Sequence, residues 1–453
     1  MTSKELHNLF AGKKITILGL GLLGRGTGVT AFLARYGAIL TVTDLKTKEE
    51  LKSSLAKLAK YPKITYVLGE HRVEDIIDAD MVMRSPDVRY DSPYVLAAEE
   101  VSVPVEMDAS LFMKLLPDGV KVVGVTGTRG KSTVSYAIAH ILEQAKSCKG
   151  NVYLAGNVRD GVTLPLLAKV KAGDVVVLEL DSWQLQGFGE AKLSPHVAVF
   201  TNLMRDHMNY YRGDMKRYAM DKTQIYRNQK KGDVLIISAQ AQEALKTYKA
   251  PKGKGEVRLG RPLFLSMSTR LPGAHNRLNM GMAAEACRAL GVLEKDIVRG
   301  VATFPGVHGR LEFLRAVKGV TYYNDNNATC PDATLVALDV FKKEKKSVVL
   351  IAGGADKNLD FTTFVRVVPK MTKAIVLLPG TATDMLLPML KGQTSLPPVA
   401  MAGSMKEAVR LARDIAARGD VVLFSPGAAS FGIFKNTYDR NDQFVAAIRA
   451  FRA

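Results

Sequence analysis

A glycine-rich segment containing one lysine is the part of this chain best suited to do chemistry. Residues 124–133 read GVTGTRGKST; an apolar run precedes them, and a helix-like stretch from Val134 to Leu142 follows. A strand, a glycine-rich loop and a helix in this order are typical of a phosphate-binding loop, whose backbone N–H groups hold an anion. Lys131 would place a positive charge on the transferred phosphoryl group, and Ser132 would offer a hydroxyl to Mg²⁺. The pattern predicts an ATP-binding site.

The spacing of the glycines departs from the strict eight-residue form of such a loop. Val125 stands where the first glycine of that form is expected, and the glycines are Gly124, Gly127 and Gly130 instead. A glycine-rich turn that is followed by Lys-Ser by chance is the alternative interpretation.

A second glycine-rich turn lies near the start of the chain. A β-type run at 14–18 is followed by GLGLLG at 19–24, by a helix-like stretch to Tyr36, and by a strand at 39–43 that leads to Asp44. This order is typical of the first βαβ unit of a dinucleotide-binding fold. On its own it favours a nicotinamide-dependent dehydrogenase, and a turn needed only for packing is the other interpretation.

Polar residues follow two strands of the central segment. A strand at 174–178 leads to Glu179, and a strand at 197–201 is followed closely by His207. Ligands and metals gather at the carboxyl ends of strands in open α/β sheets. A polar, helix-like stretch then carries Lys222.

The last segment alternates strands, at 347–351, 374–378 and 421–424, with helices, of which 406–417 has the clearest apolar period. We therefore predict an α/β protein of three domains. These are a Rossmann-like domain at 1–115, a central phosphate-loop ATPase domain with a mostly parallel sheet at 116–307, and a second Rossmann-like domain at 308–453.

Composition narrows the class of protein. Hydrophobic residues make up 47% of the 453, and no apolar stretch approaches the roughly 18 residues that span a bilayer. The start of the chain lacks an apolar signal core, so we expect a cytoplasmic protein. The three cysteines, Cys148, Cys287 and Cys330, are too far apart to suggest a disulfide framework or a metal cluster.

The charge is strongly positive. The chain has 63 Lys and Arg against 44 Asp and Glu, a net charge of +19, which attracts polyanions. The basic residues are scattered, however, and aromatic residues make up only 7%. Platforms for base stacking need aromatic side chains, so nucleic acid is not the expected partner.

Taken together, these motifs resemble the Mur ligases, and the resemblance covers nearly the whole chain. The segments that carry it, in order and spacing, are GVTGTRGKST at 124–133, LELDSWQL at 178–185, DH at 206–207, HNRLN at 275–279, GRLE at 309–312, GGADK at 353–357, and SP at 425–426 through AS at 429–430 to FKN at 434–436.

The resemblance implies an ATP- and Mg²⁺-dependent ligase that joins a carboxylate to an amine through an acyl phosphate. Within the family it implies the addition of D-glutamate to UDP-N-acetylmuramoyl-L-alanine (UDP-MurNAc-L-alanine) in peptidoglycan precursor synthesis, by an enzyme expected to be a monomer. Two alternatives remain open. One is a sibling or folylpolyglutamate-type ligase with another amino-acid acceptor, and the other is a nucleotide-binding protein without ligase activity, associated with nucleic acid.

The family's catalytic and metal-binding positions fall on a small set of residues. The resemblance implies that Ser132 and Glu179 position one Mg²⁺ and that His207 binds a second. Lys222 falls where the family carries a lysine carbamylated by CO₂, which would convert a cation into an anionic metal ligand. From the residues alone, a surface role would be the default for Lys222.

The family's ATP-binding positions also map onto this chain. The resemblance assigns adenine to Asn276 and Asn279, ribose to Asp325, and phosphate to Arg310. The loop residues that it assigns to ATP are Gly127, Thr128, Arg129, Gly130, Lys131, Ser132, Thr133 and Val134. From the residues alone, Asn276 could instead cap a helix, Asp325 could stabilise a turn, and Arg310 could pair with Glu312.

The precursor and the amino acid have their own positions. For the UDP-sugar precursor, the resemblance implies contacts with Gly21, Leu22, Asp44, Lys46, Ser85 and Asn157. For the amino-acid carboxylates it implies Thr329, Lys357 and Ser430. A helix N-cap is the alternative role for Ser430.

Three residues depart from the family pattern. Asn327 stands where a lysine is usual, Asp181 replaces a serine, and Thr437 replaces an aromatic residue. The changes gather around the amino-acid end, so the acceptor is the least specified part of the predicted reaction.

Overall fold

The computed structural model describes residues 1–159, 161–264, 266–269, 271, 273–343, 347–357, 359–430 and 433–451. The chain separates into two compact units. The first consists of Met1–Arg270 with Ala274–Phe304, and the second of Leu271–Gly273 with Pro305–Ala453. No helix in the described part of the chain combines the length and the apolar character needed to cross a membrane.

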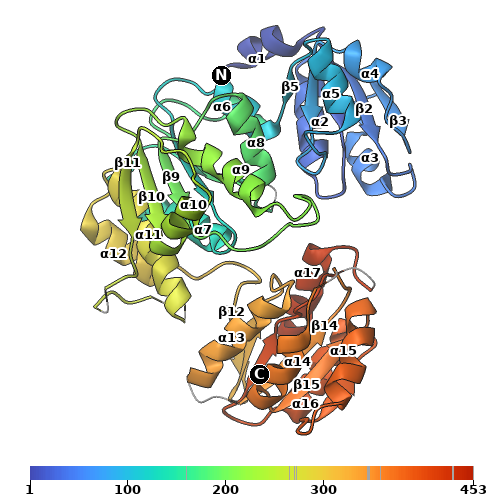
Figure 1. Cartoon of the computed structure of the whole chain (residues 1–453), viewed down its shortest axis with the longest axis vertical. Helices are drawn as coiled ribbons and strands as arrows, with labels where there is room; N and C mark the ends of the chain where they lie inside the picture. The colour runs from blue at the N-terminus through green and yellow to red at the C-terminus, as the bar shows by residue number, and fades with distance from the viewer. Residues whose placement is uncertain are drawn as a thin grey trace. The chain divides into compact units, whose positions relative to one another are not determined.

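The first sheet of unit 1 is parallel and has the order β3-β2-β1-β4-β5 (Figure 1). Its inner strands are buried on both faces because helices cover both sides: Ile15 and Ile17 are buried on one face, and Leu18 and Val82 are buried on the other. The strands are β1 (Lys14–Leu18), β2 (Ile39–Asp44), β3 (Ile64–Leu68), β4 (Met81–Arg84) and β5 (Val105–Glu106). The helices are α1 (Ser3–Phe10), α2 (Arg25–Arg35), α3 (Lys52–Leu58), α4 (Glu74–Ile77), α5 (Pro93–Glu100) and α6 (Asp108–Lys114).

The second sheet of unit 1 is also parallel, in the order β11-β10-β9-β6-β8-β7. Helix α7 packs against α11 and α12, whereas α8 packs against α9. The strands are β6 (Lys121–Thr126), β7 (Val152–Gly156), β8 (Val175–Glu179), β9 (Val197–Phe200), β10 (Val234–Ser238) and β11 (Glu256–Gly260). The helices are α7 (Lys131–Gln144), the 3₁₀ helix η1 (Leu164–Ala168), α8 (Ser182–Glu190), α9 (Met215–Arg227), α10 (Ala239–Thr247), α11 (Ala274–Ala289) and α12 (Glu294–Thr303).

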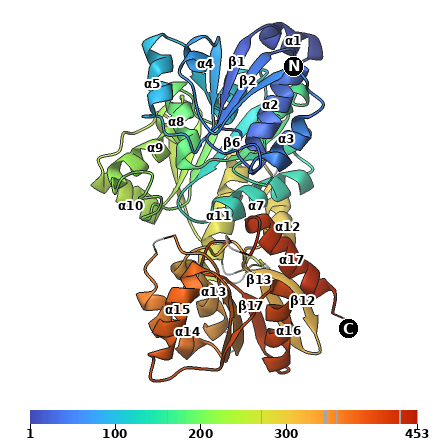
Figure 2. The same ribbon diagram turned by 90° about the vertical axis from the view of Figure 1, so that its right-hand side faces the viewer.

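Unit 2 contains a sheet of order β12-β13-β17-β14-β15-β16, with helices on both faces (Figure 2). All of its strand pairs are parallel except β12 with β13, which form an antiparallel hairpin at one edge. The strands are β12 (Glu312–Val317), β13 (Val320–Asn324), β14 (Val348–Gly353), β15 (Ala374–Leu378), β16 (Val399–Met401) and β17 (Val421–Phe424). The helices are α13 (Pro331–Lys343), α14 (Thr362–Met371), α15 (Thr381–Lys391), α16 (Met405–Ile415) and α17 (Thr437–Arg449).

The predicted α/β fold is confirmed, with two parallel sheets in unit 1 and a mixed sheet in unit 2. The strands expected at 374–378 and 421–424 are β15 and β17. The antiparallel edge strand β12 was not predicted from the sequence. Both sheets of unit 1 contribute to one hydrophobic cluster, which includes Leu33, Phe112 and Phe188. The domain boundaries near 115 and 307 stay a prediction.

A buried arginine organises the loops of unit 2. The guanidinium of Arg440 donates to Asn326 Oδ1 at 2.8 Å, to the Asn326 carbonyl at 2.9 Å and to the Ala428 carbonyl at 3.0 Å. Its side chain is fully buried, and burial lowers the pKa of Arg440 to about 10. The residue therefore ties the loop after β13 and the loop after β17 to helix α17.

We expect Arg440→Met to destabilise unit 2 by about 3 kcal/mol, because it leaves buried oxygens without their donors. Native-state hydrogen exchange of peptides covering β13 and β17 measures this, since these strands report on unit 2 alone. Arg449→Met, an exposed position on the same helix, is the matched control and should change the free energy of opening by less than about 0.5 kcal/mol. Equal effects of the two substitutions would contradict the role of Arg440.

Candidate active site

The glycine-rich loop at 127–130 joins strand β6 to helix α7. Gly127 and Gly130 have φ angles of 139° and 83°, which L side chains rarely adopt. A Cβ atom on Gly127 would lie 2.0 Å from Thr201 Oγ1, and one on Gly130 would lie 2.6 Å from Asn279 Oδ1. Both positions therefore require glycine, and the loop curls closely around the N-terminus of α7, where the helix dipole favours an anion.

The loop is held by the segment that follows β9. The amide of Thr128 donates to the Asn202 carbonyl at 2.9 Å, and the amide of Arg129 donates to Asn202 Oδ1 at 2.8 Å. Arg129 also lies 3.5 Å from Asp206. Two of the backbone N–H groups expected to meet phosphate are thus engaged by Asn202 in this structure.

Two lysines converge on one carbonyl of the loop. Lys131 Nζ donates to the carbonyls of Gly127 and Thr128, each at 3.1 Å, and Lys222 Nζ donates to the Gly127 carbonyl at 2.9 Å. The side chain of Lys222 is buried rather than on the surface, and the Tyr218 ring lies 4.8 Å from its ammonium group. Burial, aided by the charge of Lys131, holds the pKa of Lys222 well below its ordinary range.

Glu179 ends strand β8 beside the start of the loop, because it pairs with Val125 of β6. Its carbonyl accepts a hydrogen bond from the amide of Asn157 at 2.6 Å. Arg25 of α2 donates to the Asn157 side chain at 3.3 Å and to the Gly156 carbonyl at 3.1 Å. The structure thereby brings Asn157 and Glu179 together and connects them to the first sheet.

His207 lies in a turn of the loop that follows β9. Its φ angle of 56° is unusual for a residue other than glycine. The ring lies 4.9 Å from the Trp183 ring, measured between centroids. Burial lowers the pKa of His207, so its imidazole is neutral at pH 7, which is the form that binds metals.

The predicted precursor residues gather around the turn after β1. Asp44 Oδ2 accepts hydrogen bonds from the amides of Leu20 and Gly21, each at 2.9 Å, and Lys46 Nζ lies 3.8 Å from Asp44 Oδ1. The amide of Gly21 is therefore used within the protein here, whereas the Leu22 side chain is exposed.

A small cavity of about 20 Å³ lies next to this turn. Its lining includes Gly19, Arg25, Ser85 and Pro86. The Ser85 hydroxyl donates to Asp87. The turn after β1 and the loop after β4 therefore face a common space.

Helix α11 contributes two buried asparagines, and one of them contacts the loop. Asn279 Nδ2 donates to Asn276 Oδ1 at 3.3 Å, and Asn279 is the side chain that a Cβ on Gly130 would strike. Asn276 lies inside the helix, which begins at Ala274, so the helix-cap interpretation of Asn276 is wrong.

Asp325 and its neighbours belong to unit 2. Asp325 accepts hydrogen bonds from the Leu311 amide at 3.0 Å and from the Ser425 hydroxyl at 2.8 Å, so it stabilises the loops around it. Burial raises the pKa of Asp325 to about 7. Arg310 precedes Leu311, and the charge of Arg310 partly opposes this rise.

The predicted amino-acid residues also lie in unit 2. The amide of Thr329 donates to the Asn327 carbonyl at 3.0 Å, and Lys357 follows an isolated bridge between Ala355 and Ala429. The hydroxyls of Ser430 and Thr437 lie 3.1 Å apart. Asn436 caps α17, so Ser430 is not the N-cap of that helix.

The structure explains one departure from the family pattern and adds residues to the site that were not predicted from the sequence. Asp181 caps helix α8 by accepting a hydrogen bond from the Gln184 amide at 2.8 Å. Asn202 and Trp183 were not singled out. The position of Asn202, directly after the predicted strand at 197–201, was the only available signal for it.

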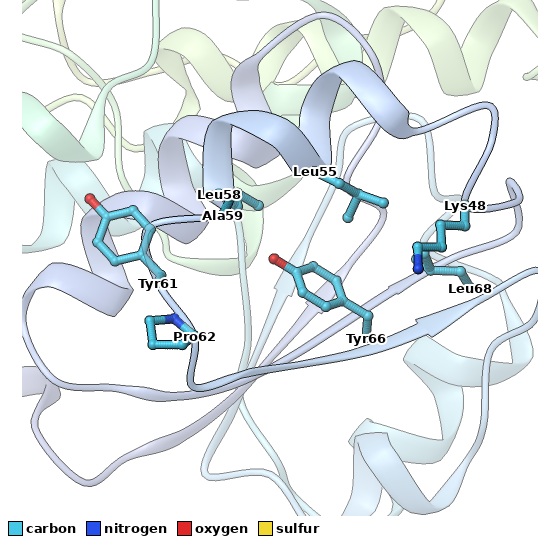
Figure 3. Close-up of a pocket in the computed structure, with 8 residues that line it drawn as sticks. All are labelled: Lys48, Leu55, Leu58, Ala59, Tyr61, Pro62, Tyr66 and Leu68. Carbon is cyan, nitrogen blue, oxygen red and sulfur yellow. The ribbon is translucent and has the colours of Figure 1, made fainter.

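A larger cavity, of about 550 Å³, opens between α3 and β3 (Figure 3). Tyr61 and Tyr66 lie along it, with Leu55 on the helix side and Lys48 at one end. None of the predicted site residues lines this cavity.

Family models match three successive parts of the chain. They are described as the Mur ligase MurD-like N-terminal domain, which matches residues 13–106, the Mur ligase middle domain, residues 125–261, and the Mur ligase glutamate ligase domain, residues 309–427.

Individual proteins agree with the family models. The UDP-N-acetylmuramoylalanine--D-glutamate ligase of Roseiflexus sp. (strain RS-1) is 38% identical, with 97% of this chain and 99% of the relative covered. Among solved structures, the UDP-N-acetylmuramate-alanine ligase MurC of Thermotoga maritima has a TM-score of 0.61 at 20% identity, over 97% of this chain and 99% of that one. The MurF ligase of Thermotoga maritima in complex with ADP has a TM-score of 0.56 at 16% identity, over 99% and 96%.

The two structural likenesses show a shared fold, and the sequence identity over nearly the full length of both proteins shows descent. Two lysines also contact the glycine-rich loop that follows strand β6. This chain belongs to the Mur ligase family.

Proposed function

We propose that this enzyme adds D-glutamate to UDP-MurNAc-L-alanine, with ATP as the energy source, in peptidoglycan precursor synthesis. The relative from Roseiflexus, which is named for this reaction, supports the choice of substrates. The observation that carries the proposal is the convergence of Lys131 and Lys222 on the Gly127 carbonyl, because a cation and a second, ionisable amine beside a helix N-terminus suit the transfer of a phosphoryl group.

In the proposed reaction the carboxylate of the precursor attacks the terminal phosphoryl group of ATP, the bond from that phosphorus to the bridging oxygen breaks, and ADP leaves. Lys131 would turn from the loop carbonyls toward that group and offset the charge that spreads over its oxygens. The resulting acyl phosphate would then be attacked by the amine of D-glutamate, with release of phosphate. Asn157, which lies against the backbone of Glu179, is suited to orient the reacting carboxylate.

The residues present fit Mg²⁺ bound partly by phosphate. Within the described ranges, no cluster of three or more His, Cys, Asp or Glu side chains is arranged to hold a metal. Mg²⁺ needs few protein ligands, since it keeps waters and substrate phosphates in its shell. We assign Ser132 and Glu179 to one ion and His207 to a second. The ions would shield charge between the phosphates and the attacking carboxylate.

Lys222 is suited to carbamylation, because a neutral amine is the nucleophile that captures CO₂. Its buried position and lowered pKa keep a fraction of the amine neutral near pH 7. The carbamate would be an anion beside Lys131, and it would be able to hold the second Mg²⁺.

We assign the precursor to the turn after β1 and the loop after β4, which share a cavity. We assign adenine to Asn276 and Asn279, and ribose and phosphate to Asp325 and Arg310. Thr329, Lys357 and Ser430 would receive the carboxylates of D-glutamate.

We further propose three domains with boundaries near 115 and 307. The enzyme would act as a monomer in the cytoplasm.

The direct test is phosphate release from ATP in the presence of Mg²⁺ and UDP-MurNAc-L-alanine, across a panel of D- and L-amino acids. We expect turnover with D-glutamate and little with the others. Turnover with a different amino acid would identify a sibling ligase. The absence of ADP formation with every amine would refute the ligase assignment.

Lys131→Ala should lower turnover by about 10²–10³-fold or more, because it removes a charge that acts on the transferred group. Hydroxylamine trapping of the acyl phosphate and phosphate release both measure this. Lys146→Ala, an exposed position just beyond the same helix, is the control and should retain full activity. Unchanged turnover in Lys131→Ala would refute the role of the loop.

Lys222→Ala should lose activity that formate or acetate partly restores, because a small carboxylate can replace the carbamate. With ¹³C-bicarbonate, the wild-type enzyme should give a carbamate signal by NMR that this variant lacks. Lys216→Ala, exposed on the same helix, should keep both the signal and the activity. Absence of the signal from wild-type enzyme at alkaline pH would exclude the modification.

A further inference from the structure

A single carboxylate gathers three arginines at a place away from the phosphate-binding loop. Asp91 accepts hydrogen bonds from Arg89 Nε at 2.7 Å and Nη2 at 2.9 Å, and it lies 3.8 Å from Arg212 and 4.0 Å from Arg217. Asp91 and Arg89 belong to the loop at 85–92, between β4 and α5, whereas the other two arginines belong to the segment between β9 and the first turn of α9. Asp91 therefore links two segments that are far apart in the sequence.

Ring contacts reinforce this link in both directions. The guanidinium of Arg89 lies 4.9 Å from the centroid of the Tyr210 ring and also donates to the Tyr210 carbonyl. The guanidinium of Arg217 lies 4.2 Å from the centroid of the Tyr90 ring. Each segment thus supplies one cation and one ring, and each such contact contributes about 0.5–1 kcal/mol at an exposed site. We call Arg89, Asp91, Arg217 and Tyr90 the arginine clasp.

The ring held by the clasp is part of a stack that ends at His207. The centroids of Tyr210 and Trp183 lie 5.1 Å apart, and those of Trp183 and His207 lie 4.9 Å apart. The amide of Tyr210 donates to the His207 carbonyl at 3.0 Å, so both residues belong to one tight turn. The buried indole N–H of Trp183 makes no hydrogen bond within the described part of the chain. The indole is therefore held by packing, through these ring contacts and through its contact with the hydrophobic cluster of unit 1.

The backbone of His207 needs such support. A φ angle of 56° is strained for a residue with a Cβ, and it persists only where the surroundings enforce it. The turn from His207 to Tyr210 is half-buried with Asn209 exposed, so water can compete for its backbone hydrogen bonds. The clasp fixes the far end of this turn through the Tyr210 carbonyl and ring.

A second, buried set of hydrogen bonds, centred on Gln186, also holds Tyr210 in place. Gln186 Oε1 accepts hydrogen bonds from the Tyr210 hydroxyl at 3.2 Å and from Arg84 at 3.3 Å. Gln186 Nε2 donates to Asp221 at 2.8 Å. Arg84 directly precedes Ser85, and Asp221 directly precedes Lys222. Through Gln186, the Tyr210 hydroxyl is therefore connected both to the loop after β4 and to the helix that carries Lys222.

We propose that Asp91 is a positioning residue that, through Arg89, fixes the Tyr210–Trp183 stack against His207 and so couples the loop at 85–92 to the metal-binding geometry. The role of His207 in metal binding rests on the proposed function. Asp91 would act through Arg89 and Tyr210 and not by contact with metal or substrate. Its effect is to reduce the number of conformations open to His207 before a metal binds.

The test uses two readouts that need no turnover. Trp183 is the one tryptophan of the chain, so fluorescence excited selectively at tryptophan rather than at tyrosine reports on the surroundings of Trp183. In Asp91→Asn we expect a red-shifted emission and stronger acrylamide quenching in the ligand-free enzyme. For the ADP-bound enzyme, Mn²⁺ serves as the metal probe, and free Mn²⁺ is measured by electron paramagnetic resonance. We expect its affinity to fall about five-fold, equivalent to about 1 kcal/mol.

Matched variants separate this role from a general effect of losing an ion pair. Arg258 donates to Glu256 through Nε at 2.8 Å and Nη2 at 3.1 Å, with the same two-residue spacing as Arg89 and Asp91. Glu256→Gln therefore removes the carboxylate of an ion pair with the same donor atoms and should leave both readouts at wild-type values. Asp91→Glu, which keeps the carboxylate, should restore most of the Mn²⁺ affinity.

Unchanged fluorescence in Asp91→Asn would overturn the proposal, because the stack would then not depend on the clasp. Changed fluorescence with wild-type Mn²⁺ affinity would overturn the coupling to His207. Failure of the wild-type enzyme to release phosphate would refute the proposed function separately, since neither readout depends on catalysis.

Discussion

Two ammonium groups that share one backbone carbonyl are the constraint on which the rest of the site depends. Lys131 and Lys222 both donate to Gly127, so their nitrogens are no more than about 6 Å apart. At an effective dielectric constant of about 20, their repulsion is on the order of 3 kcal/mol. A site built in this way favours either an anion between the two groups or the loss of one charge. Both outcomes suit a site that handles phosphate.

The order of the strands explains why the other residues gather at the same place. Strands β9, β6 and β8 are neighbours in a parallel sheet, so their carboxyl ends lie along one edge. The phosphate-binding loop follows β6, Glu179 ends β8, and the segment with Asn202 and His207 follows β9. A ligand at this edge is surrounded by residues from three separate stretches of sequence.

Much of the fold and part of the site could be predicted because they depend on local patterns. The strand, glycine-rich loop and helix around Lys131 can be predicted from hydrophobic periodicity and from the spacing of the glycines. Three contacts could not be predicted in this way: the hydrogen bond between Asn202 and the loop, the contact of Arg25 with Asn157, and the ring stack on Trp183. Each joins segments whose separation in sequence carries no regular signal. Asp181 is the opposite case. From the sequence it is a departure from the family pattern near the amino-acid end, and in the structure its side chain caps helix α8.

Because burial raises the pKa of Asp325, the free energy of unfolding of unit 2 depends on pH. The pKa of Asp325 rises from an ordinary 3.8 to about 7 because the carboxyl is buried. Between these two values the unfolded chain has lost a proton that the folded unit retains, so the free energy of unfolding decreases as the pH rises through this range. Above pH 7 the folded unit carries a buried anion, and a hydroxyl that donates to it would offset part of the penalty. The binding of any group that donates a hydrogen bond to this carboxylate would therefore be coupled to the release of its proton.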